Sequence, residues 1–216
     1  MGITQIITTI AGTGTGGFNG DGISATTADL NLPHGLTVDS AGNIYIAEEL
    51  NNRIRKISIN TGIISTFAGT GTGGYNGDGL AATSTMIDAP FGLTFDVSGN
   101  LYFADRNNNR IRKITKSTGL VSTVAGTGTA GYNSDGIAAT SAMLNSPIDV
   151  NLDANGNLLI ADWVNHRVRK VDKNSGIIST IAGTGTFGYN GEGIPATSAD
   201  IARPFGIIFD NSGNIY

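Results

Sequence analysis

The chain has 216 residues, no cysteine and a formal net charge of −4. The absence of cysteine excludes disulfides and thiol chemistry. The acidic balance argues against a nucleic-acid partner, because a nucleic-acid surface needs a basic face to displace counterions. No apolar run approaches the roughly 18 residues of a membrane span, and no secretory signal follows Met1. This composition fits a cytoplasmic protein, or an exported one that does not rely on disulfides.

A repeat organises the whole chain. The segment Ala-Gly-Thr-Gly-Thr returns every 57 residues, and a proline and a Gly-Asn pair return with the same period without any insertion or deletion. A fixed period of this length predicts a repeat architecture. The first residues of these segments are Ala11, Ala68, Ala125 and Ala182, and the prolines are Pro33, Pro90, Pro147 and Pro204.

One repeat reads as four short strands. Residues 92–96, 101–104, 111–114 and 120–125 are rich in β-branched and aromatic side chains, and polar turns separate them. The turn at 96–100 contains Asp96 and Gly99, which suit a tight hairpin, and residues 81–86 are expected to form one or two helical turns. The sequence therefore predicts an all-β fold, a β-propeller of four-stranded antiparallel blades.

Two blocks carry a family resemblance. The stretches NLYFADRNNNRIRKI (100–114) and NLLIADWVNHRVRKV (157–171) resemble NHL repeats. The Asn165-His166 pair fits the motif, although Arg167 stands where the name implies leucine, and the first blade departs with Glu48 and Glu49. The resemblance implies a propeller, usually of six blades, and favours an extracellular or periplasmic bacterial protein.

The phase of the repeat predicts the organisation of the chain. We expect residues 1–216 to form one array, with blades at 34–68, 91–125 and 148–182 and partial blades at 1–11 and 205–216. A fourth strand is expected at 5–11 and a first strand at 205–210. The chain is 12 residues short of four periods. The sequence thus reads as a fragment whose remaining blades lie in a longer chain, with closure by oligomerisation as the alternative.

Glycine-rich and acidic segments recur in the long connections. A G-x-G-x-x-G match begins at Gly69 and at three equivalent glycines, but no long helix follows, so it predicts a structural turn and no bound cofactor. One acid per connection supplies too few ligands for calcium, and we expect it to accept backbone N–H bonds at the start of the helical turn. These acids, which remain weak calcium candidates, are Asp21, Asp78, Asp135 and Glu192.

Basic and aromatic residues also recur. An Arg-x-Arg-Lys run begins at Arg53, Arg110 and Arg167. We expect its arginines to pair with the acid that ends the neighbouring strand, and a phosphate-binding stripe is the alternative. One aromatic residue in each long connection is expected to pack against its blade, with a sugar-binding ring as the alternative. This set is Phe18, Tyr75, Tyr132 and Tyr189.

Strand alternation places the long connections and the loops between second and third strands on one face. Equivalent loop positions differ there. One position carries Glu49, Arg106 and Trp163, and another carries Asn52, Asn109 and His166. Such positions are candidates to determine binding specificity. The alternative is that their sequence has drifted on a solvated loop. His34 and Phe91, equivalent to each other just inside the first strand, are expected to plug the channel mouth.

Three functions remain open. No catalytic set or metal spacing stands out, which favours a non-catalytic module that binds a protein or carbohydrate ligand through the long-loop face. The alternative is a lyase- or lactonase-type enzyme with a metal in the channel, the kind of activity found in some six-bladed relatives. Asp149, which stands where the other repeats have Gly35, Gly92 and Gly206, is the one residue that could serve it. A structural spacer in a large surface protein is the third.

Overall fold

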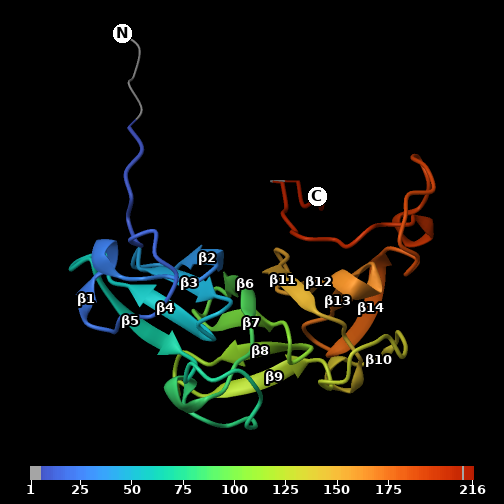
Figure 1. The fold of residues 1–216 in the computed structure, drawn as a ribbon. Helices are drawn as coiled ribbons and strands as arrows, with labels where there is room; N and C mark the ends of the chain where they lie inside the picture. Colours follow the sequence, from blue (N-terminus) through green and yellow to red (C-terminus); the bar gives the residue numbers. More distant parts are fainter. Residues whose placement is uncertain (1–5, 211) are drawn as a thin grey trace.

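The computed structural model describes residues 6–210 and 212–216. Three antiparallel sheets lie side by side, each built from four strands that are consecutive in the chain (Figure 1). This arrangement confirms the predicted all-β propeller with three four-stranded blades. The strands are β2 (Pro33–Val38), β3 (Ile44–Glu48), β4 (Arg53–Ile57) and β5 (Ile63–Ala68), then β6 (Pro90–Phe95), β7 (Leu101–Asp105), β8 (Arg110–Ile114) and β9 (Val121–Ala125), and finally β11 (Pro147–Leu152), β12 (Leu158–Asp162), β13 (Arg167–Val171) and β14 (Ile177–Ala182).

The long connections protect the outer edges of the sheets. Each of the three connections that precede a sheet runs along the outermost strand of that sheet and adds a short strand or a single bridge to it, as in the pairing of Ile23 with Ile64. An unpaired edge strand would otherwise offer its backbone to other chains. The added elements are β1 (Ile23–Ser24), β10 (Ile137–Ala138) and the bridge between Ala81 and Leu120, and short 3₁₀ helices follow at η1 (Ala25–Thr27), η2 (Ala82–Ser84), η3 (Ala139–Ser141) and η5 (Ala196–Ser198), with η4 (Trp163–Asn165) in a separate loop.

An aspartate organises each tight turn at the opposite end of the strands. In the second blade Asp96 accepts backbone N–H bonds from Ser98 and Asn100, both at 2.9 Å, and Gly99 has a φ of 81°. Burial raises the pKa of Asp96, but the bonds from the Asn100 side chain and backbone outweigh it and lower the pKa below its ordinary value. The Asn100 carboxamide also accepts the N–H of Lys116 at 2.9 Å, which ties the two turns of the blade together.

The first strands of neighbouring blades approach closely around the channel. A Cβ added to Gly92 would lie 2.2 Å from Oδ1 of Asp149, and one added to Gly35 would lie 2.0 Å from the carbonyl oxygen of Phe91. There is no room for a side chain at either glycine. The repeat therefore needs glycine here wherever a neighbouring first strand packs this closely.

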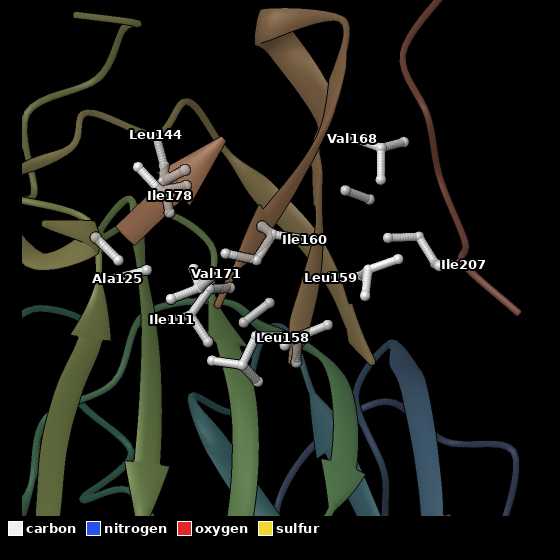
Figure 2. Packing of buried hydrophobic residues seen from close by; sticks show 14 of the residues in the cluster. Ile111, Ala125, Leu144, Leu158, Leu159, Ile160, Val168, Val171, Ile178 and Ile207 are labelled. Atoms are coloured by element: carbon white, nitrogen blue, oxygen red, sulfur yellow. The ribbon is translucent and has the colours of Figure 1, made fainter. Parts of the chain in front are cut away.

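Two of the three clusters of buried apolar residues span neighbouring blades, and the third lies between the first blade and the connection that precedes it. Ala125 of the second blade packs with Leu144 and Ile178 of the third (Figure 2). On the other side of the third sheet, Leu159 packs near Ile207, which comes from the segment that follows the sheet. Each sheet thus buries its faces against its neighbours, as expected for a repeat too small to form its own core.

The partial blades differ from expectation. Residues 6–11 form no strand, and Ile6 and Ile7 are 82% and 99% exposed; residue 5 of the expected strand and residues 1–4 of the expected partial blade lie outside the described part. The expected first strand at 205–210 is reduced to one bridge between Phe209 and Ile215. Neither segment has an extended partner strand beside it, so a ladder of backbone hydrogen bonds does not form. Within the described residues no helix is long and apolar enough to span a membrane.

Candidate functional site: the channel mouth

A shallow depression of about 190 Å³ lies at the mouth of the channel, on the face of the long connections. Its walls come from two repeat-equivalent positions. One is the residue that follows each proline at the start of a first strand, and the other is the residue just after each second strand. The lining residues are His34, Glu49, Phe91, Arg106, Ile148, Trp163 and Phe205.

A chain of polar contacts crosses from the first blade to the second. Nε2 of His34 lies 2.5 Å from one carboxylate oxygen of Glu49, and a guanidinium nitrogen of Arg106 donates to the other at 2.8 Å. The three side chains are 28%, 18% and 23% exposed. They are therefore fixed in place yet still reachable from solvent.

Aromatic rings surround this chain. The His34 ring stacks on Phe91 with 3.8 Å between centroids, and Phe205 meets Phe91 edge-on at 5.5 Å. Arg106 lies over Trp163 at 5.4 Å. Arg203 lies over the same indole at 4.8 Å. Trp163 is consequently half-buried between cations and is not the freely exposed residue that would make a simple hot spot.

Five of the residues singled out from the sequence therefore converge here: His34, Glu49, Phe91, Arg106 and Trp163. The phase of the repeat makes Ile148 and Phe205 equivalent to His34 and Phe91, although they were not among the predicted binding residues. Sequence reasoning did not single out Arg203, whose contact with Trp163 depends on the tertiary structure. Chemically, the depression combines the guanidinium group of Arg106, one carboxylate and several aromatic rings, with Arg203 beside it over Trp163, which suits the recognition of a mixed apolar and charged group.

His166 does not reach the mouth. Its Nδ1 accepts the backbone N–H of Arg203 at 3.2 Å, as the side chain of Asn109 accepts that of Ser146 at 2.9 Å. Burial lowers the pKa of His166, and the charges of Arg203 and Arg167 lower it further. Asn52, Asn109 and His166 thus share one contact, since each accepts a backbone N–H at the end of the following long connection, and His166 lies outside the depression.

The arginine run forms a buried network in each blade. In the second blade Arg112 is fully buried and contacts Asp105 at 3.2 Å and Asp78 at 3.0 Å. The ring of Tyr75 lies under both Arg110 and Arg112, at 3.8 and 4.8 Å. Equivalent contacts are made by Arg55 with Glu48 and Asp21 over Phe18, and by Arg169 with Asp162 and Asp135 over Tyr132.

The arginine network changes two expectations from the sequence, one about the acids of the long connections and one about the recurring aromatic residues. The acids of the long connections were expected to cap the helical turns, but η1, η2, η3 and η5 have no side-chain cap. Asp21, Asp78 and Asp135 instead pair with the buried arginines. The aromatic residues Phe18, Tyr75 and Tyr132 pack against the arginines of this network. The equivalent Tyr189 is 73% exposed.

Burial also shifts the acids that end the second strands. Desolvation raises the pKa of Asp105 and of Asp162 to about 6 against the opposing effect of their hydrogen bonds, and it raises that of Glu48 as well. Each of these carboxyls accepts a hydrogen bond from an asparagine of its loop; for example, Asn108 donates to Asp105 at 2.9 Å. The network is structural in position, since it lies inside the blade.

Asp149 lies apart from the mouth. It is half-buried, its carboxylate accepts the N–H of Ile207 at 2.8 Å, and burial raises its pKa. It fills the space between the third blade and the following segment. In the part of the chain that the structure describes, no three His, Asp or Glu residues lie close enough to hold a metal ion.

Comparisons with known proteins agree with this architecture. A family model described as the teneurin NHL domain matches residues 13–75, and one described as the NHL repeat matches residues 144–171. These two segments make the chain similar to NHL-repeat proteins. Its relatives include the Arabidopsis thaliana protein SUPPRESSOR OF QUENCHING 1, 29% identical over 76% of this chain, and bovine NHL repeat-containing protein 2, 29% identical over 70%. The chain spans only 16% and 22% of the length of these relatives.

Solved structures share the propeller fold with this chain. An auxiliary nutrient binding protein from Bacteroides ovatus superposes with a TM-score of 0.64 at 16% identity, covering 92% of this chain and 52% of that one. A virginiamycin B lyase from Staphylococcus aureus superposes with a TM-score of 0.54 at 18% identity, covering 90% and 50%. At these identities the likeness concerns the fold alone.

Proposed function

We propose that the chain is a non-catalytic binding module that recognises a protein ligand at the channel mouth. The observation that carries this proposal is the convergence of three equivalent positions with different side chains, Glu49, Arg106 and Trp163, on one depression. If these positions served only to stabilise the fold, the same residue would be expected in every blade. Different residues at one shared site instead create an asymmetric surface, which is what specific recognition requires.

The chemistry of the depression favours a protein over a glycan. A sugar stacks on an open aromatic face, but His34 covers Phe91, and Arg106 and Arg203 lie over Trp163. Phe205, 61% exposed, offers apolar surface beside these guanidinium groups. A peptide segment with a carboxylate next to an apolar side chain matches both features.

The single tryptophan of the chain allows a direct test. A displayed library of random peptides is selected on the intact chain, and selected peptides are titrated while the fluorescence of Trp163 is recorded. We expect saturable binding that changes this fluorescence and weakens at least tenfold in Arg106→Ala. Lys116→Gln, on the opposite face, serves as the control and is expected to leave binding unchanged.

Two results would overturn the proposal. The first is selected peptides that bind Arg106→Ala as well as they bind the unaltered chain. The second is a glycan array in which a sugar binds in a Trp163-dependent manner while no peptide does, which would replace the protein ligand with a carbohydrate.

A further inference from the structure

A second concave site lies at the other end of the strands, between the first and second blades. This turn-end groove has a volume of about 530 Å³, within the size range of small-molecule sites. The tight turns at 39–43 and 96–100 form its lips, so it faces away from the long connections. Its lining includes Tyr45, Phe67, Phe95, Leu101 and Ile114 inside, with Lys56 and Lys116 at the rim.

The floor of the groove is aromatic and rigid. The ring of Tyr45 meets Phe67 and Phe95 edge-to-face, each with 4.9 Å between centroids. Leu101 and Ile114 close the floor and are 1% and 2% exposed. Such a surface suits a flat apolar body, because the partly buried rings of Phe67 and Phe95 are accessible for contact, while the buried ring of Tyr45 holds them in place.

The rim supplies available positive charge. Within the described residues neither Lys56 nor Lys116 has a carboxylate partner, and Lys56 lies 5.6 Å above the Tyr45 ring. The nearby carboxylates are already saturated. Asp39 accepts bonds from Ala41 N, from Asn43 N and Nδ2 and from the Tyr45 hydroxyl, at 2.8 to 3.0 Å. The ammonium groups are therefore the polar groups free to meet a ligand.

The repeat provides an internal comparison. The equivalent groove between the second and third blades has about 330 Å³, and Val124 and Lys113, which stand in the places of Phe67 and Lys56, do not line it. Val97, on the lip shared by both grooves, is fully exposed where the other repeats carry Ser40 and Ala154. The larger volume and the Phe67 ring are thus particular to the first groove and are not a consequence of the repeat.

We propose that the turn-end groove binds a small amphipathic anion. A flat aromatic body lies on the floor formed by Tyr45, Phe67 and Phe95, and the carboxylate of the ligand meets the ammonium groups of Lys56 and Lys116. This site is separate from the channel mouth and does not depend on the function proposed for the mouth.

The test uses naphthoate as the probe and naphthamide as its neutral match, each titrated into the chain by calorimetry. We expect naphthoate to bind at one site and naphthamide to bind at least fivefold more weakly, since only the former has a charge for the lysines. Lys56→Gln and Lys116→Gln are each expected to weaken naphthoate by about fivefold. Phe67→Val, which copies the residue of the other groove, is expected to weaken both probes.

Lys113→Gln and Lys173→Gln are the matched controls, because these lysines are equivalent to Lys56 and Lys116 but belong to the next blade. They are expected to bind naphthoate normally. The proposal fails if no saturable binding is seen at millimolar naphthoate, or if both probes bind equally. It also fails if the control variants weaken binding as much as Lys56→Gln and Lys116→Gln do. Trp163 fluorescence is expected to show no competition between naphthoate and a peptide bound at the mouth, which keeps the two sites distinguishable.

Discussion

In each of the three blades, the third strand buries one arginine against two carboxylates and an aromatic ring, and the residues are of the same type every time. At the channel mouth the equivalent positions carry a carboxylate, a guanidinium and an indole. This difference distinguishes residues that the fold requires from positions at which the fold tolerates different side chains. Inside the blade a change would leave a buried charge without a partner, whereas at the mouth the side chains are partly solvated.

The largest effect is expected from Arg112→Ala. The substitution leaves Asp105 fully buried beside Asp78 without its cation, and breaking a buried pair costs roughly 3–5 kcal/mol. Urea denaturation measures the loss. Lys113→Ala, one residue along the strand and only partly buried, is the control and is expected to change stability by less than about 0.5 kcal/mol. A loss below about 1 kcal/mol for Arg112→Ala would mean that the network does not hold the blade.

Two equivalent glycines test the close approach of the first strands. Gly92→Ala is expected to cost about 1–3 kcal/mol, because the added Cβ would lie 2.2 Å from Asp149 Oδ1 and 2.7 Å from its Cα. Gly206→Ala is its match, since nothing lies within 4 Å of a Cβ there. Thermal unfolding of both variants should show a lower Tm for the first alone; equal Tm values would contradict the packing argument.

The buried acids predict a pH dependence of stability. The folded-state pKa values of Asp105 and Asp162, about 6, lie above those of an unfolded chain, so the folded chain binds protons that the unfolded chain does not. This contribution is present at low pH and is lost as pH rises through 6. The free energy of unfolding should therefore increase on going from pH 7 to pH 5, by on the order of 1–2 kcal/mol.

Urea denaturation across this range measures the pH effect, and Asp105→Asn should reduce the increase. A decrease between pH 7 and pH 5 would contradict it. Further down, the direction should reverse, because hydrogen bonds hold the pKa values of Asp39, Asp96 and Asp153 below their ordinary value and these turns lose a carboxylate when they protonate.

A smaller effect is expected at the recurring aromatic position. Tyr75→Ala removes the ring under Arg110 and Arg112 and should cost about 1–2 kcal/mol. Tyr189→Ala, at the equivalent but 73% exposed position, should cost less than about 0.5 kcal/mol. Denaturant midpoints of the two variants compare them directly, and an equal loss at both would show that the ring contributes only local packing.

The smallest effect on stability is expected at the mouth. Arg106→Ala removes a partly exposed pair with Glu49, which is worth about 0–1 kcal/mol. The variant should unfold close to the unaltered chain while losing the peptide binding proposed for this site. A loss of stability as large as that of Arg112→Ala would contradict the view that the arginine network stabilises the fold while the channel mouth does not.

The sequence predicted much of this arrangement, and the misses have common causes. The period placed the strands and put Glu49, Arg106 and Trp163 on one face, because antiparallel strands sort their loops by end. It could not show that His166 acts as Asn52 and Asn109 do, since two chemically different side chains there accept the same kind of backbone bond. It also read the acids of the connections as local caps, although their partners lie more than 30 residues away.

The sequence by itself determined the repeat, the four-stranded blade and the face on which variable residues gather, because these follow from local periodicity and strand alternation. Only the tertiary structure decided which of those residues meet. The angle and spacing between blades bring His34 onto Phe91 and open a groove beside Phe67 that the next pair of blades lacks. Such contacts depend on the shape of side chains from different blades, and a periodic pattern carries no information about that fit.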